Sequence, residues 1–204
     1  MVLQGGTFMN LAQPIKKTKE LEKFKNYYKE IKPNCRNELL IVLGLNTALR
    51  ISDILSLEWS SVYDFEKKEY KNHIFITEQK TGKMSQIYIN SSTLEALKKY
   101  KEYLEQRNQI VDSNTFLFNH SNKNVPITRS QAFRIIKEAA EYYSISGVIS
   151  CHSLRKTFGY HAWKQGVPPV LLVTIFNHSS FNITKRYLGI EQDDKDKIFK
   201  KIKL

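Results

Sequence analysis

Residues Asn34–Trp59 read NCRNELLIVLGLNTALRISDILSLEW, and this stretch decides the fold. Asn34 is a favoured N-cap residue, so a helix is expected to begin directly after it. The run Leu39–Leu45 is apolar nearly all round the helix, which is typical of a helix at the centre of a core. A second, short helix is expected from near Ser52, and Trp59 closes the segment. The sequence therefore predicts a protein built around one central helix.

The segments on either side of this centre have different periodicities. Thr18–Ile31 carries one apolar stripe with lysines opposite it, and it is expected to form a helix that ends at Pro33. His73–Thr77 and Met84–Ile89 are rich in β-branched and aromatic residues and flank a polar turn with one glycine, which predicts a β-hairpin. The segment Val62–Phe65 is expected to add a third strand to it.

The second half of the chain is expected to be mostly helical. Capping boxes at Ser92–Glu95 and Thr128–Gln131 predict two helix starts. Ser153 can cap a third helix that stops at Gly166, and Pro168-Pro169 can occupy the first turn of a fourth. The expected fold class is therefore mainly α with a small antiparallel β-sheet, an α+β fold.

The composition indicates a soluble protein with an anionic partner. Lys and Arg number 32 against 20 Asp and Glu, a formal net charge of +12 on 204 residues, which favours DNA, RNA or an anionic membrane as partner. No stretch approaches the about 18–20 apolar residues of a membrane span, and no signal peptide is evident. Two cysteines, Cys35 and Cys151, are too few for a disulfide framework and fit a reducing compartment.

Eight side chains suited to binding or acting on a phosphate group lie in four short segments. In chain order they are Arg50 and Asp53, Lys80 and Lys83, His152 and Arg155, and His178 and Tyr187. Taken singly, each segment has an ordinary structural explanation, such as a charge pair at a helix start or a solvated hairpin tip. His152 and Arg155, one turn apart at a helix start, can also donate to one anion held there.

The order and spacing of these residues resemble the tyrosine recombinase family, also called phage integrases. That family's pattern runs Arg, Lys in a β-hairpin, His-x-x-Arg, then His or Trp, and Tyr nine residues later. The flanking segments Thr47–Leu57, Cys151–Gly166 and Pro168–Tyr187 are similar to the family's as well, and the resemblance extends over Thr18–Leu204. One departure is Phe176-Asn177, where the family has Leu-Gly before the histidine. The resemblance implies the fold of a tyrosine recombinase catalytic domain.

The resemblance also implies a covalent reaction on DNA. Tyr187 would attack the scissile phosphate, form a 3′-phosphotyrosine and release a 5′-hydroxyl, which conserves the phosphodiester energy and requires no metal, ATP or other cofactor. The transition state spreads negative charge over the phosphate oxygens and needs fixed cationic donors. Arg50 and Arg155 would supply forked guanidinium contacts, and His178 would donate a further hydrogen bond.

The remaining catalytic roles concern protons. His152 is the family's candidate base for the tyrosine, whose free pKa is near ~10. Lys80 matches the family's general acid for the leaving oxygen, and its Lys-Thr-Gly context favours it over Lys83. Asp53 would not contact the phosphate itself, and would orient the arginines and histidines that do.

The function that the resemblance implies is that of a site-specific DNA recombinase or integrase, encoded by bacterium or phage and acting in the cytoplasm on nucleoid DNA. Its expected partner is double-stranded DNA at a specific site, bound as a tetramer, with a monomer or weak oligomer when free and no membrane. Candidate DNA contacts are Lys83, Arg129 and Arg134, although a solvated helix face explains the two arginines as well. Two alternatives stay open: a non-catalytic DNA-binding regulator derived from a recombinase, and a type IB topoisomerase-like activity.

The expected organisation is simple. Residues 1–14 form a flexible leader and residues 15–204 a single catalytic domain. The additional N-terminal core-binding domain usual in the family is absent from this sequence, so the chain is either a fragment of a longer integrase or a catalytic-domain-only recombinase. The charged, amphipathic tail 191–204 is suited to docking on a neighbouring subunit, or to folding back on its own.

Overall fold

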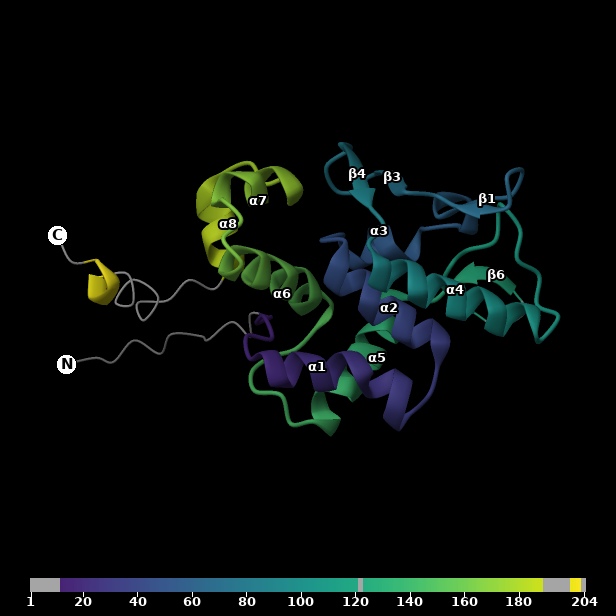
Figure 1. The fold of residues 1–204 in the computed structure, drawn as a ribbon, viewed down its shortest axis with the longest axis horizontal. Helices are drawn as coiled ribbons and strands as arrows, with labels where there is room; N and C mark the ends of the chain where they lie inside the picture. The colour runs from purple at the N-terminus through teal and green to yellow at the C-terminus, as the bar shows by residue number, and fades with distance from the viewer. Residues whose placement is uncertain (1–11, 121–122, 189–198, 203–204) are drawn as a thin grey trace, which may run out of the picture.

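The computed structural model describes residues 12–120, 123–188 and 199–202, and helices dominate it (Figure 1). The expected leader is thus described only from residue 12, and residues 191–198 and 203–204 of the expected tail lie outside the described part. The helices are α1 (Thr18–Asn26), continued by the π-helical turn η1 (Tyr27–Ile31), α2 (Cys35–Asn46), α3 (Ile51–Leu55), the short 3-10 turn η2 (Trp59–Ser61), α4 (Ser91–Glu105), α5 (Arg129–Tyr142), α6 (Cys151–Lys164), α7 (Pro169–Ile175) and α8 (Phe181–Leu188).

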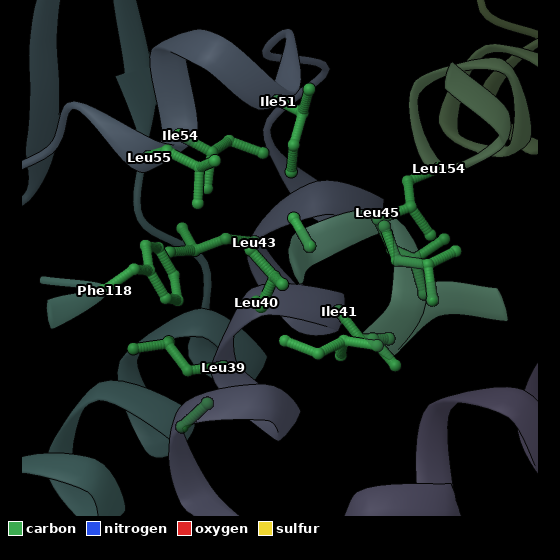
Figure 2. Packing of buried hydrophobic residues seen from close by; sticks show 14 of the residues in the cluster. Leu39, Leu40, Ile41, Leu43, Leu45, Ile51, Ile54, Leu55, Phe118 and Leu154 are labelled. Atoms are coloured by element: carbon green, nitrogen blue, oxygen red, sulfur yellow. The ribbon is translucent and has the colours of Figure 1, made fainter. Parts of the chain in front are cut away.

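Helix α2 lies at the centre of the core, as its apolar sequence predicts. The Asn34 side chain caps it by accepting a hydrogen bond from the backbone N–H of Asn37 at 3.0 Å. Leu39 and Leu43 are fully buried, and Figure 2 shows the leucines and isoleucines of this helix surrounded by side chains from α3, α6 and the segment around Phe118. Gly44 permits close packing on α6, because a Cβ there would lie 2.3 Å from Cδ1 of Leu154.

Three separate two-stranded antiparallel ribbons replace the single small sheet that we expected. The hairpin of β3 (His73–Thr77) and β4 (Met84–Tyr88) confirms the predicted one. The expected third strand does not join it: β1 (Tyr63–Asp64) turns back through Lys68, which adopts φ 55°, and pairs with β2 (Glu69–Tyr70). A third ribbon, β5 (Asn119–His120) with β6 (Lys123–Pro126), had no clear sequence signal.

Two predicted helix starts are shifted by a few residues. Helix α4 is capped by Asn90, whose side chain accepts from the N–H of Thr93. The N-cap therefore lies two residues before Ser92, the expected one. Helix α6 is capped by Ser150 rather than Ser153; Ser153 is the partner residue of that capping box, three positions into the helix. The Thr128–Gln131 box is confirmed. The shift at α6 places His152 inside the first helical turn.

A second, small apolar core joins helices α6, α7 and α8, which lie together at one end of the molecule in Figure 1. It consists of four buried residues: Ala48, Leu172, Phe176 and Leu188. Gly159 of α6 makes this packing possible, because a Cβ there would lie 2.6 Å from the Phe176 ring. The predicted end of α6 at Gly166 is confirmed by its φ of 91°.

The start of the described chain packs onto α6. Lys156 donates to the carbonyl of Ala12 at 2.6 Å, and the N–H of Gln13 donates to Val148 O at 2.9 Å. Within residues 12–120, 123–188 and 199–202, no helix combines the length and the apolar character that crossing a membrane requires.

Candidate active site

Helix α3 begins with two side chains that both face the β3–β4 hairpin. Arg50 is the N-cap residue, with extended backbone, and its guanidinium Nη1 donates to the carboxylate of Glu78. Asp53 is fully buried, and its Oδ1 accepts from the backbone N–H of Gln79 at 3.0 Å. Its other oxygen, Oδ2, has no hydrogen-bond partner among the described residues. The start of α3 is therefore fastened to the hairpin just before Lys80.

The hairpin turn carries both candidate lysines. Its backbone is closed by the N–H of Glu78 donating to Lys83 O at 2.9 Å, and by the N–H of Gly82 donating to Glu78 O at 2.8 Å. Gly82 has φ 64°, a conformation that glycine adopts without a steric cost. Lys80 and Lys83 are both exposed, so both ammonium groups face solvent.

Arg155 is a deeply buried cation of the candidate site, with 1% of its surface exposed. Its Nη1 donates to Ala48 O and its Nη2 to Phe176 O, the latter at 2.6 Å. Its guanidinium also lies over the Phe176 ring, 4.8 Å from the centroid. Burial, and next the charge of Arg50, lower its pKa to about 10. The side chain is therefore held rigidly between the main body and the α7–α8 unit.

His178 and Tyr187 are brought together by the α7–α8 unit. Their ring centroids are 4.6 Å apart in an edge-on arrangement, and the Phe176 ring stacks on His178 at 5.1 Å. Nδ1 of His178 lies 2.9 Å from the hydroxyl of Thr184. The residue that departs from the family pattern, Phe176, thus packs between Arg155 and His178.

Electrostatic effects show that the four segments converge. Burial, followed by the charges of Arg155 and Arg50, lowers the pKa of His178 to about 4. The pKa of His152 is lowered by burial first and by nearby cations second. Lys80 is among the charges that lower both histidine pKa values. Tyr187 likewise acts on the pKa of Arg155. The structure therefore gathers the six candidate catalytic residues that the sequence spreads over four segments.

The two candidate DNA-contact arginines differ in position. Arg129 is exposed at the start of α5, and its charge is the leading ionic cause of the lowered pKa of His152. Arg134, further along α5, lines a shallow surface hollow together with Gln131 and His120. Only Arg129 of this pair lies beside the candidate active site.

Two residues of the site were missed by sequence reasoning. Glu78 is buried, and its carboxylate accepts from Arg50, Ser85 and Asn177. Asn177 donates to it at 2.5 Å across 99 positions of sequence. No local spacing relates these residues, although the Phe176-Asn177 departure marked the second of them. Across the described residues, no group of three or more His, Cys, Asp or Glu side chains is arranged to hold a metal ion.

The low pKa of His178 makes a prediction about stability. A histidine whose pKa is about 4 in the folded protein but near 6.5 when unfolded binds its proton preferentially in the unfolded state. Its contribution to stability is therefore complete above pH about 6.5 and is lost as the pH falls toward about 4. Thermal melts between pH 7.5 and 4.5 should show a smaller loss of melting temperature in His178→Asn than in the wild type. Parallel pH profiles for the two proteins would contradict the assignment.

Comparison with known proteins gives one family. The model of the phage integrase family matches residues 17–193. A protein of Bacillus subtilis (strain 168), described as the probable integrase/recombinase YoeC, is 37% identical over 91% of this chain and 93% of its own length. A tyrosine recombinase of Agathobacter rectalis is 30% identical over 76% of this chain, and there the chain spans about half of the relative, 48% of it.

Solved structures of similar fold include three recombinases. The XerH site-specific recombinase bound to palindromic difH substrate, a post-cleavage complex, aligns with a TM-score of 0.76 at 19% identity, over 94% of this chain and 53% of its own. The XerA recombinase aligns at 0.74 and 18% identity, over 95% and 68%. The lambda integrase bound to DNA aligns at 0.64 and 18%, over 95% and 65%. Similarity at this level of identity shows a shared fold.

Proposed function

Because the chain belongs to the phage integrase family, whose members break and rejoin DNA, we propose that it is a site-specific recombinase. It cleaves and rejoins double-stranded DNA through a 3′-phosphotyrosine, without metal or ATP. The observation that carries the proposal is the convergence of Tyr187 and His178, 4.6 Å apart, with the charges of Arg155, Arg50 and Lys80 around them.

The proposed chemical step exchanges one phosphoester for another. The Oη atom of Tyr187 attacks phosphorus, a Tyr–O–P bond forms, and the bond from phosphorus to the 5′ oxygen breaks. The lowered pKa of His152 keeps its imidazole neutral near pH 7, so it can take the phenol proton. Lys80, at the exposed hairpin tip, gives a proton to the leaving 5′ oxygen. Rejoining is the reverse, with a 5′-hydroxyl attacking the phosphotyrosine.

The proposed charge stabilisation comes from three fixed donors. Arg50 and Arg155 each use part of the guanidinium for protein contacts, and the Nε–H of Arg155 has no partner among the described residues. We propose that the remaining N–H groups donate to the non-bridging oxygens. The lowered pKa of His178 keeps its imidazole neutral near pH 7. In the tautomer whose Nδ1 accepts from the Thr184 hydroxyl, 2.9 Å away, the proton resides on Nε2 and can be donated to the phosphate. Asp53 orients the hairpin by holding the Gln79 N–H.

We assign the general acid to Lys80 rather than Lys83, because Lys80 has the Lys-Thr-Gly context and follows Glu78, which is tied to Arg50, by two positions. Lys83 is then a DNA-backbone contact. Arg129, beside His152, is a second such contact, and Arg134 is a more distant one. Neutralising the backbone in this way makes the affinity for DNA depend on salt.

We extend the proposal to assembly and location. Residues 15–204 act as one catalytic domain in a cytoplasmic, nucleoid-associated enzyme, which is a tetramer on its DNA site and a monomer or weak oligomer when free. The tail 191–204 docks on a neighbouring subunit. Phe199 and Ile202, the described apolar residues of that tail, are 76% and 57% exposed, which suits docking.

A nicked suicide substrate tests the proposed function. Duplexes drawn from the DNA that flanks this gene should trap the wild-type protein covalently, because the short 5′ fragment diffuses away after cleavage. We expect a protease-sensitive, SDS-resistant complex at one position only. Specific binding without trapping would favour the non-catalytic regulator, and relaxation of supercoiled DNA that lacks the site would favour the topoisomerase-like activity.

A further inference from the structure

The hairpin that carries Lys80 is anchored by apolar packing along one face only, where Ile74 is fully buried in the large core and Ile76 and Ile87 pack against it. Three of its large side chains point into solvent: Phe75, Met84 and Tyr88 are 59%, 78% and 64% exposed. Its strands pair only with each other. The apolar contacts with the core come from the strands and not from the turn, residues 78–83, so the position of Lys80 depends on polar ties at the base of the turn.

Those ties converge on the carboxylate of Glu78, two residues before Lys80. Its Oε1 accepts from the Ser85 hydroxyl at 2.8 Å and from the Asn177 amide at 2.5 Å. Its Oε2 accepts from Arg50 and from the Thr81 hydroxyl, the latter at 3.2 Å. The side chain is 1% exposed. One buried carboxylate therefore contacts the start of α3, both sides of the hairpin turn, and the residue that precedes His178.

From this arrangement we infer that Glu78 is a positioning residue, which holds the hairpin against Arg50 and Asn177 so that the Lys80 ammonium reaches the leaving oxygen. The inference rests on the proposed function. Glu78 contacts Arg50 through Nη1 alone, so the pair leaves the other guanidinium N–H groups free for a phosphate.

A carboxylate is suited to this role and an amide is not. Its two oxygens can accept about four hydrogen bonds, which matches the four donors around Glu78, whereas one end of a glutamine donates. Hydrogen bonds from Ser85 and Asn177 and the charge of Arg50 outweigh burial and lower the pKa of Glu78, so the carboxylate stays ionised. A buried carboxylate with all its hydrogen-bond partners holds those partners in place, and removing a partner lowers the stability of the fold.

The side chain of Asn177 provides one of the hydrogen bonds to Glu78. Asn177 adopts φ 49°, a left-handed conformation that glycine and asparagine tolerate best. The glycine usual at this position would satisfy the backbone but would offer no side chain. The amide in this chain reaches both Glu78 and, at 3.1 Å, the hydroxyl of Ser85. It thereby links the segment carrying His178 directly to the hairpin carrying Lys80.

The test compares two leaving groups in single-turnover cleavage of the suicide substrate. One substrate has the natural 5′ oxygen, and the other has sulfur in that bridging position. A thiolate leaves without protonation because thiols have a pKa near ~8.5, so the sulfur substrate does not need Lys80. We expect Glu78→Ala to slow cleavage of the oxygen substrate by about 100-fold, the usual effect of misplacing a catalytic group by about 1 Å. Cleavage of the sulfur substrate should stay within a few-fold of the wild type.

Matched variants separate positioning from folding. Asn177→Gly keeps the backbone conformation and removes only the amide, so it should give the same selective defect in a smaller degree. Lys80→Ala should show the full oxygen-selective defect. Glu66→Ala, an exposed carboxylate in the turn between β1 and β2, should match the wild type on both substrates.

Equal slowing of both substrates in Glu78→Ala and Asn177→Gly would overturn the inference, because the carboxylate would then act through Arg50 or the fold. Unchanged cleavage of the oxygen substrate would overturn it too. Failure of the wild type to form a covalent complex on either substrate is a different result, which would remove the proposed function itself and this inference with it.

Discussion

Replacing Tyr187 with phenylalanine should abolish covalent capture of DNA while leaving DNA binding intact. The phenol Oη is the only atom that the substitution removes, and it is the proposed nucleophile. The ring would keep its edge-on contact with His178 and its contact with Phe176, whose centroids lie 4.6 and 5.7 Å away, so the fold should be unaffected. Loss of a nucleophile lowers the rate by at least about 10⁴-fold, so no complex should be visible on a denaturing gel.

The matched control for this variant is Tyr142→Phe. Tyr142 is an exposed tyrosine on α5, and its hydroxyl belongs to no part of the candidate site. This control should be trapped as efficiently as the wild type. Covalent capture by Tyr187→Phe would show that another side chain attacks the phosphate, and loss of capture in Tyr142→Phe would show that the assay reports on folding.

Replacing Arg155 with lysine should lower the cleavage rate by about 10²–10³-fold, although the positive charge is kept. The guanidinium spans two carbonyls, those of Ala48 and Phe176, while keeping N–H groups for a phosphate. An ammonium group is a compact charge without this planar fork, so it cannot make both contacts and still reach the DNA. Single-turnover cleavage on the suicide substrate measures the effect.

The same variant should also be less stable. One carbonyl would lose its donor inside the protein, which costs about 1–3 kcal/mol and should lower the melting temperature by several degrees. Arg107→Lys is the matched control, because Arg107 lies over the Tyr103 ring at 3.8 Å, at the far end of α4. A wild-type cleavage rate in a folded Arg155→Lys would contradict the proposed role of the guanidinium.

The parts of this site that could be predicted from the sequence are those with local signals. Arg50 and Asp53 share one helix start, and Tyr187 lies nine residues after His178, within α8. Their order and spacing match the family pattern, and this resemblance relates them. The central helix was predictable because the run Leu39–Leu45 has no polar face. The sequence pattern therefore predicted the candidate catalytic set and the structure that carries its members.

The parts that could not be predicted depend on contacts between distant segments. Glu78 lies in an ordinary polar turn by sequence, and its importance appears only once Asn177, 99 positions away, is beside it. The segment at Tyr63 has a good strand composition, but pairing partners are decided by chain reversal at Lys68 rather than by composition. Ser150 and Ser153 are both suitable caps; α6 begins after Ser150, and Ser153 is the third residue of the helix in the same capping box.

The division of the apolar interior into a large and a small core has a consequence for motion. Helix α8, which carries Tyr187, and the α7–α8 connection, which carries His178, are held mainly by the small cluster around Phe176 and Leu188. Arg50 is instead next to residues of the large core. Subglobal opening costs least where few apolar contacts are broken, so amide protons of α7 and α8 should exchange sooner than those of α2. Faster exchange in α7 and α8 than in α2 would show that the segment carrying the nucleophile opens in a smaller unfolding event, while Arg50 stays packed on the large core.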